Sequence, residues 1–207
     1  MNEQEKFWIS KFGNIYRDSN LKFDDNLQIK AWGKMLAAIM NDNNKPKSVL
    51  ECGSNIGRNL MTLRRLLPDA KLSLIEINKK SFELALRNVN PEYSFNGSIL
   101  QSNFPKEQFD LTFTCGVLIH IPPYDLFKNM EKIYNYSKKY VLIAEYFARS
   151  FETKIYHGQL NKLFKMDFGI YLMDNFKVDI VDYGFLWGRE YDAGGFDDIT
   201  WWLFEKK

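Results

Sequence analysis

The chain has 207 residues, of which 45% are hydrophobic and 26% are charged. This length and composition are sufficient for the core of one ordinary domain but not for the cores of two. Its 28 Lys and Arg against 26 Asp and Glu leave a net charge of +2, which excludes the strongly basic surface typical of nucleic-acid-binding proteins and favours a small ligand. The N-terminus, MNEQEKFWISKF, is polar where a secretory signal is apolar, and no apolar run reaches the roughly 20 residues of a membrane span. We therefore expect a cytoplasmic chain without membrane contact.

The middle of the chain alternates short apolar runs with helical patterns that proline residues separate. Before this alternation, apolar residues at helical spacing predict a helix that covers the core: Ile29, Trp32, Leu36, Ile39 and Met40. The predicted strands span residues 48–52, 71–77, 93–95, 109–115 and 140–146. The predicted helices between them span residues 57–66, 79–88 and 124–136. Continuously apolar strands joined by crossover helices predict a parallel sheet with helices on both faces.

The C-terminal segment breaks this alternation. Two β-rich runs, residues 178–187 and 199–204, flank a Gly194-Gly195 turn with no helical pattern between them, which predicts an antiparallel hairpin. We expect the aromatic residues of these runs to belong to the core, with an exposed stacking surface as the alternative. They are Tyr183, Phe185, Trp187, Trp201, Trp202 and Phe204.

The two cysteines, Cys52 and Cys115, each lie at the end of an apolar run and show no metal-ligand spacing. We expect buried free thiols, with a redox pair as the alternative. The sequence predicts no metal site.

The stretch SVLECGSNIGRNL, residues 48–60, leads from the first predicted strand through a small-residue turn into a helix. In an open parallel sheet, ligands bind beyond the carboxyl ends of the strands, where this turn forms the floor of the site. Gly53 and Gly57 let the backbone approach a ligand, and Asn55 tolerates left-handed backbone angles. Glu51 offers a carboxylate. The spacing G-x-x-x-G differs from the G-x-G-x-x-G of dinucleotide sites, and a plain tight turn is the alternative.

Two further signals follow the turn. Glu76 ends the next predicted strand, about 20 residues on, where an acid can bind both hydroxyls of a ribose; a surface glutamate is the alternative. The segment FDLTFTCGVLIHIPP then forms a strand that closes into a proline pair. In order and spacing, five features within residues 45–146 resemble the class I S-adenosylmethionine-dependent methyltransferases: Glu51-Cys52-Gly53, Gly57, Glu76, Gly97-Ser98 and the segment 109–123.

This resemblance implies an α/β fold, namely a Rossmann-like, doubly wound, seven-stranded sheet that is mostly parallel and ends in an antiparallel hairpin. It also implies S-adenosyl-L-methionine as the cofactor. Glu51, Gly53, Asn55, Gly57, Gly116 and Val117 would surround its methionine part, Glu76 would bind the ribose, Ile77, Ser98 and Ile99 would contact the adenine, and Trp8, Tyr16 and Asn20 would form an N-terminal flap. Simple helix packing is the alternative for the flap residues.

Motifs at both ends of the chain carry a narrower resemblance. FWISKFGNIYRDSN near the start, YHGQLNKLFKMDFG at residues 156–169, and DYGFLWGREY with DDITWWLFEKK at the end resemble the methylase family associated with pseudaminic acid biosynthesis. The chain departs from that family at Ser19 and His157, where arginine is expected. The resemblance implies one methyltransferase domain over residues 1–207: a helical flap (1–45), a cofactor-binding core (46–147), and an acceptor segment with the terminal hairpin (148–207).

The implied function is methyl transfer to a small molecule, an acidic sugar of the nonulosonic or pseudaminic acid pathway or its nucleotide derivative. A catalytically inactive S-adenosylmethionine-binding module that contacts partner proteins through the aromatic C-terminus is the alternative. The acceptor atom and the oligomeric state do not follow from the sequence.

His157 and His120 are the candidate bases, because they are the two histidines of the chain and their ordinary pKa lies near 6.5. Structural hydrogen bonding is the alternative for each. Residues 156–169 are expected to include a helix that overhangs the strand ends. Tyr146, Tyr156 and Lys165 are the candidate acceptor-binding residues, and a solvated helix face explains the lysine almost as well.

Overall fold

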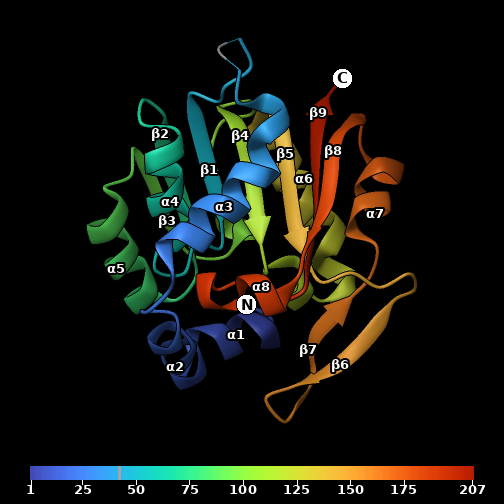
Figure 1. Ribbon diagram of the computed structural model, residues 1–207. Helices are drawn as coiled ribbons and strands as arrows, with labels where there is room; N and C mark the ends of the chain where they lie inside the picture. The colour runs from blue at the N-terminus through green and yellow to red at the C-terminus, as the bar shows by residue number, and fades with distance from the viewer. Residues whose placement is uncertain (42) are drawn as a thin grey trace.

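The apolar runs of the sequence become the strands of a seven-stranded sheet in the computed structural model, which describes residues 1–41 and 43–207 (Figure 1). The strands are β1 (Ser48–Cys52), β2 (Lys71–Glu76), β3 (Tyr93–Asn96), β4 (Phe109–Cys115), β5 (Ser137–Glu145), β8 (Val178–Leu186) and β9 (Ile199–Lys206). Their spatial order is β3-β2-β1-β4-β5-β9-β8. β1 to β5 pair in parallel, and β9 lies antiparallel between β5 and β8. The predicted fold class is confirmed.

Helices cover both faces of the sheet because successive residues of a buried strand point to opposite sides. Val49 packs with α3 (Asp25–Leu36), α4 (Arg58–Leu66) and α5 (Lys79–Val89), whereas Leu50 packs with α6 (Pro123–Tyr136) and α7 (Phe168–Asn175). The ring of Trp32 on α3 is fully buried and meets Phe113 of β4 edge-on at 4.8 Å. Truncating Trp32 to alanine would cost about 3–5 kcal/mol of stability.

Two short N-terminal helices, α1 (Glu3–Ile9) and α2 (Lys11–Ser19), lie below the carboxyl ends of the strands (Figure 1). Asn2 and Glu5 form a capping box that starts α1, and the Ser10 side chain accepts from the backbone of Phe12 to start α2. Caps are important for helices this short, which are unstable on their own. The helices together form the segment that we call the lid, residues 3–19. No helix among the described residues has the length and apolar character needed to cross a membrane.

The expectation of a helix at the start of residues 156–169 is wrong. β6 (Glu152–Tyr156) and β7 (Gln159–Lys165) instead form a separate antiparallel hairpin, and α7 begins only at Phe168. His157 and Gly158 form its two-residue loop with φ values of 47° and 77°, and Tyr156 pairs with Gln159 across it. Two consecutive positive φ angles are typical of the hairpin turn whose twist matches the strands. Lys165 therefore lies on a strand and not on a solvated helix face.

The predicted pairing of the last two strands is confirmed, but their connection is no tight turn. The connection contains a short helix, α8 (Gly188–Tyr191), and a 3-10 turn, η4 (Asp192–Gly194).

The burial of the C-terminal aromatic residues depends on the strand that carries them. Trp201, Trp202 and Phe204 on β9 are buried, whereas Tyr183, Phe185 and Trp187 in and after β8 are exposed because β8 is the edge of the sheet. For these last three, the expectation of a core position is wrong.

Candidate functional site

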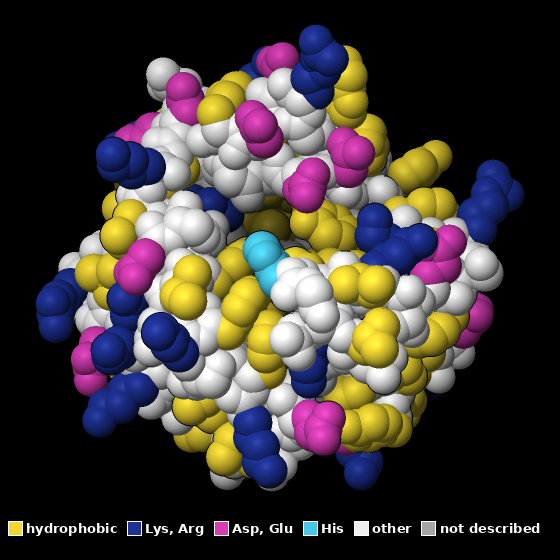
Figure 2. Space-filling model, turned by 90° about the horizontal axis from the view of Figure 1, so that it is seen from below, with side chains coloured by type: hydrophobic (Ala, Val, Ile, Leu, Met, Phe, Trp, Pro, Cys, Tyr) yellow, Lys and Arg dark blue, Asp and Glu magenta, His cyan; other side chains and the backbone are white. Residues whose placement is uncertain are grey.

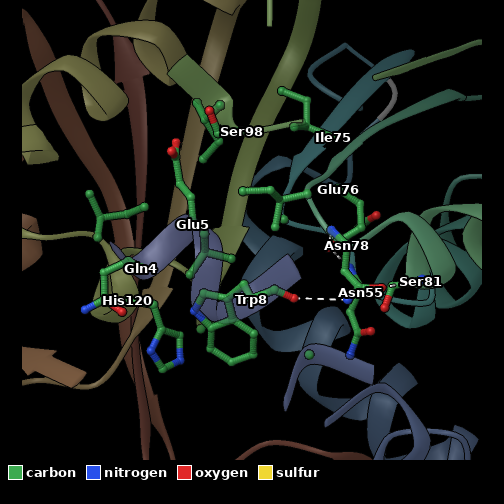
Figure 3. Close-up of a pocket in the computed structure, with 18 of the residues that line it drawn as sticks. Gln4, Glu5, Trp8, Asn55, Ile75, Glu76, Asn78, Ser81, Ser98 and His120 are labelled. Carbon is green, nitrogen blue, oxygen red and sulfur yellow. Dashed lines mark hydrogen bonds between the residues drawn. The ribbon is translucent and has the colours of Figure 1, made fainter. Parts of the chain in front are cut away.

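A pocket lies at the carboxyl edge of the sheet, between the loops that follow β1 to β4 and the lid (Figure 3). Seen from this edge, the surface has a central hollow with apolar side chains inside it and a histidine beside it (Figure 2). The lining contains most of the residues that the sequence singled out: Trp8, Tyr16, Asn20, Gly53, Asn55, Glu76, Ile77, Ser98, Ile99, Gly116, Val117 and His120. Glu51, Gly57, Tyr146, Tyr156, His157 and Lys165 lie outside it.

The turn after β1 has the conformation that its small residues permit. Gly53, Asn55 and Gly57 all have positive φ, at 88°, 48° and 81°. A Cβ atom at Gly53 would lie 2.6 Å from Cγ2 of Val117, so the turn packs directly on the loop after β4. At Gly57 a Cβ atom would overlap Val89 of α5, so this glycine serves the packing of α4 on α5. The floor of the pocket is therefore backbone, as expected.

Glu76 connects the turn to the loop after β2. It is buried, and its two oxygens accept hydrogen bonds of 2.7 Å from the backbone N–H groups of Asn55 and Asn78. Burial raises its pKa to about 6, and these backbone hydrogen bonds act in the opposite direction. At neutral pH the carboxylate is ionised at the pocket wall, and each of its oxygens keeps a further lone pair for a ligand donor.

Four polar side-chain atoms of the lining are buried and have no hydrogen-bond partner among the described residues. They are Oε1 of Gln4, Oγ of Ser54, Nε of Arg58 and Oγ of Ser98. A buried polar atom without a partner costs about 1–3 kcal/mol. A ligand that supplies matching groups removes this cost. The adenine amino group predicted for Ser98 is such a group.

Glu51 lies beneath the pocket and is fully buried. One oxygen accepts from the Asn59 side chain at 2.7 Å, and the other has no partner among the described residues. Burial raises the pKa of Glu51 to about 8, so this carboxyl group is mostly protonated at pH 7. The structure does not bring it to the pocket lining.

Glu145, at the end of β5, lies outside the pocket lining but holds the loop after β4, and the sequence reasoning missed it. It is fully buried and accepts backbone hydrogen bonds from Val117 at 3.1 Å, Leu118 at 3.0 Å and Ile119 at 3.3 Å. Burial raises its pKa to about 7, against the effect of these bonds. The same sequence signal that identified Glu51, an acidic residue at the end of an apolar strand, is also present at Glu145.

His120 joins the loop after β4, the lid and the β6–β7 hairpin. Its Nδ1 lies 2.7 Å from the backbone oxygen of Lys162, and its ring meets Trp8 edge-on at 4.6 Å (Figure 3). Because a carbonyl oxygen can only accept, Nδ1 carries the proton and Nε2 keeps a lone pair. Burial lowers the pKa of His120 to about 4, so the ring is neutral at pH 7.

The other acceptor candidates surround the pocket without lining it. His157 is exposed at the hairpin tip, with its ring 5.3 Å from that of Phe12. Tyr146 donates a hydrogen bond of 2.9 Å to Asp197, and the Lys165 ammonium lies 4.9 Å from the centre of the Tyr146 ring.

Tyr156 lies beside the pocket wall formed by His120, with 5.0 Å between the two rings. The structure brings Tyr146 and Lys165 together, and it brings Tyr156 to His120. His157 lies beside Tyr156, with 4.5 Å between the centres of the two rings.

Hydrogen bonds from three further parts of the chain hold the lid. The Asn78 side chain donates to the backbone oxygen of Trp8 at 3.0 Å. Asn2 donates to Asp125 at the start of α6 at 2.8 Å. Gln4 donates to a backbone oxygen of β7. The lid thus bridges the loop after β2, the start of α6 and the hairpin.

Residues 49–139 match the family model described as a methyltransferase domain. No curated protein matches the sequence. Among solved structures, a magnesium protoporphyrin IX methyltransferase from Synechocystis PCC 6803 with bound S-adenosylhomocysteine is similar, with a TM-score of 0.70 and 15% identity over 98% of this chain and 98% of that chain. A 1,6-didemethyltoxoflavin-N1-methyltransferase from Burkholderia thailandensis has a TM-score of 0.70 and 13% identity over 98% and 87%. An S-adenosylmethionine-dependent methyltransferase from Leishmania major has a TM-score of 0.72 and 16% identity over 98% and 81%.

At these identities, the likeness to solved structures concerns the fold. The narrower resemblance to the methylases associated with pseudaminic acid biosynthesis stays a prediction. The matched segment contains β1 to β4 and the glycine turn, so it supplies most of the pocket. Residues 49–139 and the fold of the chain are thus similar to those of S-adenosylmethionine-dependent methyltransferases, which supports S-adenosylmethionine as the cofactor.

Proposed function

We propose that this chain transfers the methyl group of S-adenosylmethionine to a small acidic sugar or its nucleotide derivative. The observation that carries the methyltransferase part is the pocket wall, where an ionised Glu76 with both oxygens on backbone N–H groups faces the same cavity as the unpartnered Oγ of Ser98. A nucleoside needs both features, because its ribose donates hydroxyls and its adenine donates an amino group. The acidic-sugar part rests on the narrower family resemblance.

Each part of the cofactor has residues that fit it. Glu76 would accept from the ribose hydroxyls, and Ser98 would accept from the adenine amino group between Ile77 and Ile99. The backbone of the Gly53–Gly57 turn and of Gly116 and Val117 would surround the methionine part. The cofactor supplies an electrophilic methyl group when bound.

The chain's own residues would then align the acceptor and exclude water, because methyl transfer is an in-line displacement that depends on position. The lid covers the pocket and places Trp8 over it. Tyr146 and Lys165 would bind the acceptor at the rim, where a cation beside a phenol suits an anionic sugar. Tyr156 would bind it next to His120.

His120 is the better placed of the two candidate bases. It lines the pocket and its Nε2 has a free lone pair, whereas His157 is exposed outside the lining. We assign proton acceptance to His120, where the acceptor needs a base, and contact with the acceptor at the rim to His157. His120→Asn should lower kcat while leaving S-adenosylhomocysteine binding intact, whereas His157→Asn should mainly raise KM.

The proposal is tested by incubating the full chain with S-adenosylmethionine and a panel of acceptors, with S-adenosylhomocysteine as the measured product. The panel pairs N-acetylneuraminic acid, pseudaminic acid and their cytidine monophosphate derivatives with neutral N-acetylhexosamines. Turnover confined to the acidic compounds supports the proposal. Turnover with neutral sugars alone contradicts the acidic-sugar part, and failure to bind S-adenosylhomocysteine contradicts the whole.

A second candidate function is a binding module without catalysis. The observation that favours it is the exposed edge strand β8, where Tyr183 is 68% exposed and Phe185 and Trp187 are each more than half exposed. Large exposed aromatic side chains in a row are typical of interaction surfaces. Turnover with any acceptor separates the two functions, because the binding module would bind S-adenosylmethionine and release no S-adenosylhomocysteine.

A further inference from the structure

Gln4, in the first turn of α1, is a buried amide that uses only one of its two polar ends. It is 6% exposed and lines the pocket. Nε2 donates to the backbone oxygen of Asn161 on β7, so the amide nitrogen faces the hairpin. Oε1 is buried and has no hydrogen-bond partner among the described residues. A buried acceptor atom of this kind is costly unless a ligand donates to it.

The hairpin strand β7 holds Gln4 and His120 through consecutive residues. The backbone oxygen of Asn161 accepts from Gln4, and that of Lys162 lies 2.7 Å from Nδ1 of His120. In a regular strand, successive backbone oxygens point to opposite sides. Here, residues 160–162 of β7 lie opposite a single residue of β6, and Asn161 has a φ of +55°. This bulge lets two successive oxygens bind side chains of the pocket.

The two side chains lie at the same end of the pocket. Gln4 and Trp8 are four positions apart on α1, which places them on one face of the helix. The ring of Trp8 lies 4.6 Å from that of His120, and all three residues line the pocket (Figure 3). Nδ1 of His120 carries the proton, so Nε2 keeps its lone pair. Oε1 of Gln4 and Nε2 of His120 are thus two acceptors, each oriented by a bond to β7.

Two acceptor atoms in one place favour a ligand group that donates two hydrogen bonds. Neighbouring hydroxyl groups, or a hydroxyl beside an acylamino N–H, supply two donors, and sugars carry both patterns. An ionised carboxylate can only accept, so it does not fit between these atoms. It fits better at the rim, where the Lys165 ammonium lies beside Tyr146.

We propose that Gln4 and His120 form a subsite for two neighbouring donor groups of the acceptor, and that Gln4 is a residue that determines specificity for them. The proposal deepens the proposed function and rests on it, because it takes the acceptor to be a sugar. It gives the sugar an orientation, with hydroxyl or acylamino groups at the lid and the carboxylate at the rim. Gln4 comes from the lid and His120 from the loop after β4, so the subsite is complete only while the lid is bonded to β7.

Calorimetric titration of the full chain, saturated with S-adenosylhomocysteine, tests the proposal with three probes. N-acetylneuraminic acid has hydroxyls and a carboxylate, its methyl ester keeps the hydroxyls and lacks the charge, and N-acetylglucosamine is neutral. Gln4→Met keeps a side chain of similar length without the amide. It should weaken the binding of the acid and of the ester by the same factor, about 10-fold, and leave the affinity for S-adenosylhomocysteine within about threefold.

Two further variants complete the design. Lys165→Gln should weaken the binding of the acid and leave that of the ester unchanged, because its partner is the carboxylate. Lys6→Met is the matched control, because Lys6 is exposed on the same helix and lies outside the pocket lining. It should change no affinity.

The possible outcomes separate the explanations. A loss in Gln4→Met for the acid but not for the ester would place the carboxylate at Gln4 and overturn the proposal. An equal loss for S-adenosylhomocysteine would show that Gln4 only holds the lid, and unchanged sugar affinities would remove it from the site. If Gln4→Met does not fold by thermal unfolding, His120→Phe, which keeps a ring against Trp8, is titrated with the same probes. No loss of sugar affinity there overturns the proposal.

The wild type distinguishes failure of the subsite from failure of the proposed function. Binding of S-adenosylhomocysteine but of none of the three probes would overturn the subsite and leave the methyltransferase part standing. Binding of N-acetylglucosamine alone, with a selective loss in Gln4→Met, would support the subsite and contradict the acidic-sugar part. Failure to bind S-adenosylhomocysteine would refute the proposed function, on which the subsite rests.

Discussion

Glu145 at the end of β5 accepts a hydrogen bond of 3.0 Å from the backbone N–H of Leu118 in the loop after β4. The neighbouring N–H groups of Val117 and Ile119 donate to the same carboxylate. Val117 lines the pocket and packs against Gly53 of the turn. A side chain outside the pocket lining thus sets the position of the pocket wall.

Glu145→Ala should therefore lower stability and cofactor affinity together. Three backbone donors would lose their acceptor in a buried place, which we expect to cost about 2–4 kcal/mol of the free energy of unfolding. Urea denaturation measures the first effect, and calorimetric titration with S-adenosylhomocysteine measures the second. Glu152→Ala on β6, whose partner is the exposed Lys154, is the control. If Glu145→Ala behaves like the control, the loop is held by other contacts.

Glu76→Gln should weaken S-adenosylhomocysteine binding by about 10- to 100-fold. The change removes the charge from the acceptor of two ribose hydroxyls, and it places an amide NH₂ opposite one of the backbone donors, Asn55 or Asn78. The dissociation constant from calorimetry is the measurement. Glu83→Gln, exposed on α5, should leave the affinity unchanged. An unaltered dissociation constant in Glu76→Gln would remove this residue from the ribose site.

The stability of the protein should fall as pH rises, in part because of Glu51. Its pKa is about 8 in the folded chain, against an ordinary value of 4.5, and burial is the cause. Between these two values the folded state holds the proton more tightly than the unfolded state, so stability from this group is fully present at low pH and is lost as pH rises through the folded pKa.

Glu51→Gln removes this titration and keeps an acceptor for Asn59. Urea denaturation of wild type and variant at several pH values between about 5 and 8 gives the difference in slope, which should reach up to about 1.4 kcal/mol per pH unit. Glu76 and Glu145 titrate in the same direction in both proteins, so the comparison isolates Glu51. Parallel slopes for the two proteins would mean that the folded pKa of Glu51 is close to normal.

Gly195→Ala should destabilise the chain and lower its affinity for S-adenosylhomocysteine. The new methyl group would enter the space of the guanidinium of Arg58, which lines the pocket, and the residue would also keep an unfavourable positive φ. Gly158→Ala in the hairpin loop is a matched control, because its φ is +77° and no atom lies within 4 Å of the added Cβ. Thermal unfolding and calorimetry of both variants separate the cost of a positive φ, which both share, from the cost of the overlap with Arg58, which only Gly195→Ala has. Equal effects in the two variants would show that the contact with Arg58 contributes nothing.

The sheet was predictable because its strands are buried on both sides. The predicted bounds of β1 and β4 agree with the structure, since parallel strands such as Phe109–Cys115 contain almost only residues that tolerate full burial. The β6–β7 hairpin was missed because most of its residues are exposed, so no apolar periodicity marks it. Its His157-Gly158 loop is also a less familiar form of the turn than Asn-Gly.

The floor of the pocket was also predictable. Backbone that approaches a ligand needs residues that are small or tolerate left-handed backbone angles, such as Gly53 and Asn55. Contacts between distant parts of the chain were not predictable. Arg58 and Gly195 are 137 positions apart, and Glu145 and Val117 are 28 apart. The local pattern around either partner gives no sign of the other. Only the fold, by placing β5 beside β4 and the β8–β9 connection beside α4, brings them together.

The position of β9 has a consequence for biosynthesis. β9 lies between β5 and β8, although both of these strands precede it in the chain. Until the ribosome has produced residues 199–206, β5 has one unpaired edge although most of its residues are buried in the finished fold. β8 has no partner strand at all during this time. Open edges of this kind promote aggregation during synthesis. Gly195 is synthesised just before β9, so the hydrogen bond from Arg58 to its backbone oxygen also forms late. We therefore expect nascent chains arrested before residue 199 to depend on chaperones and to acquire cofactor affinity only after this last strand has inserted.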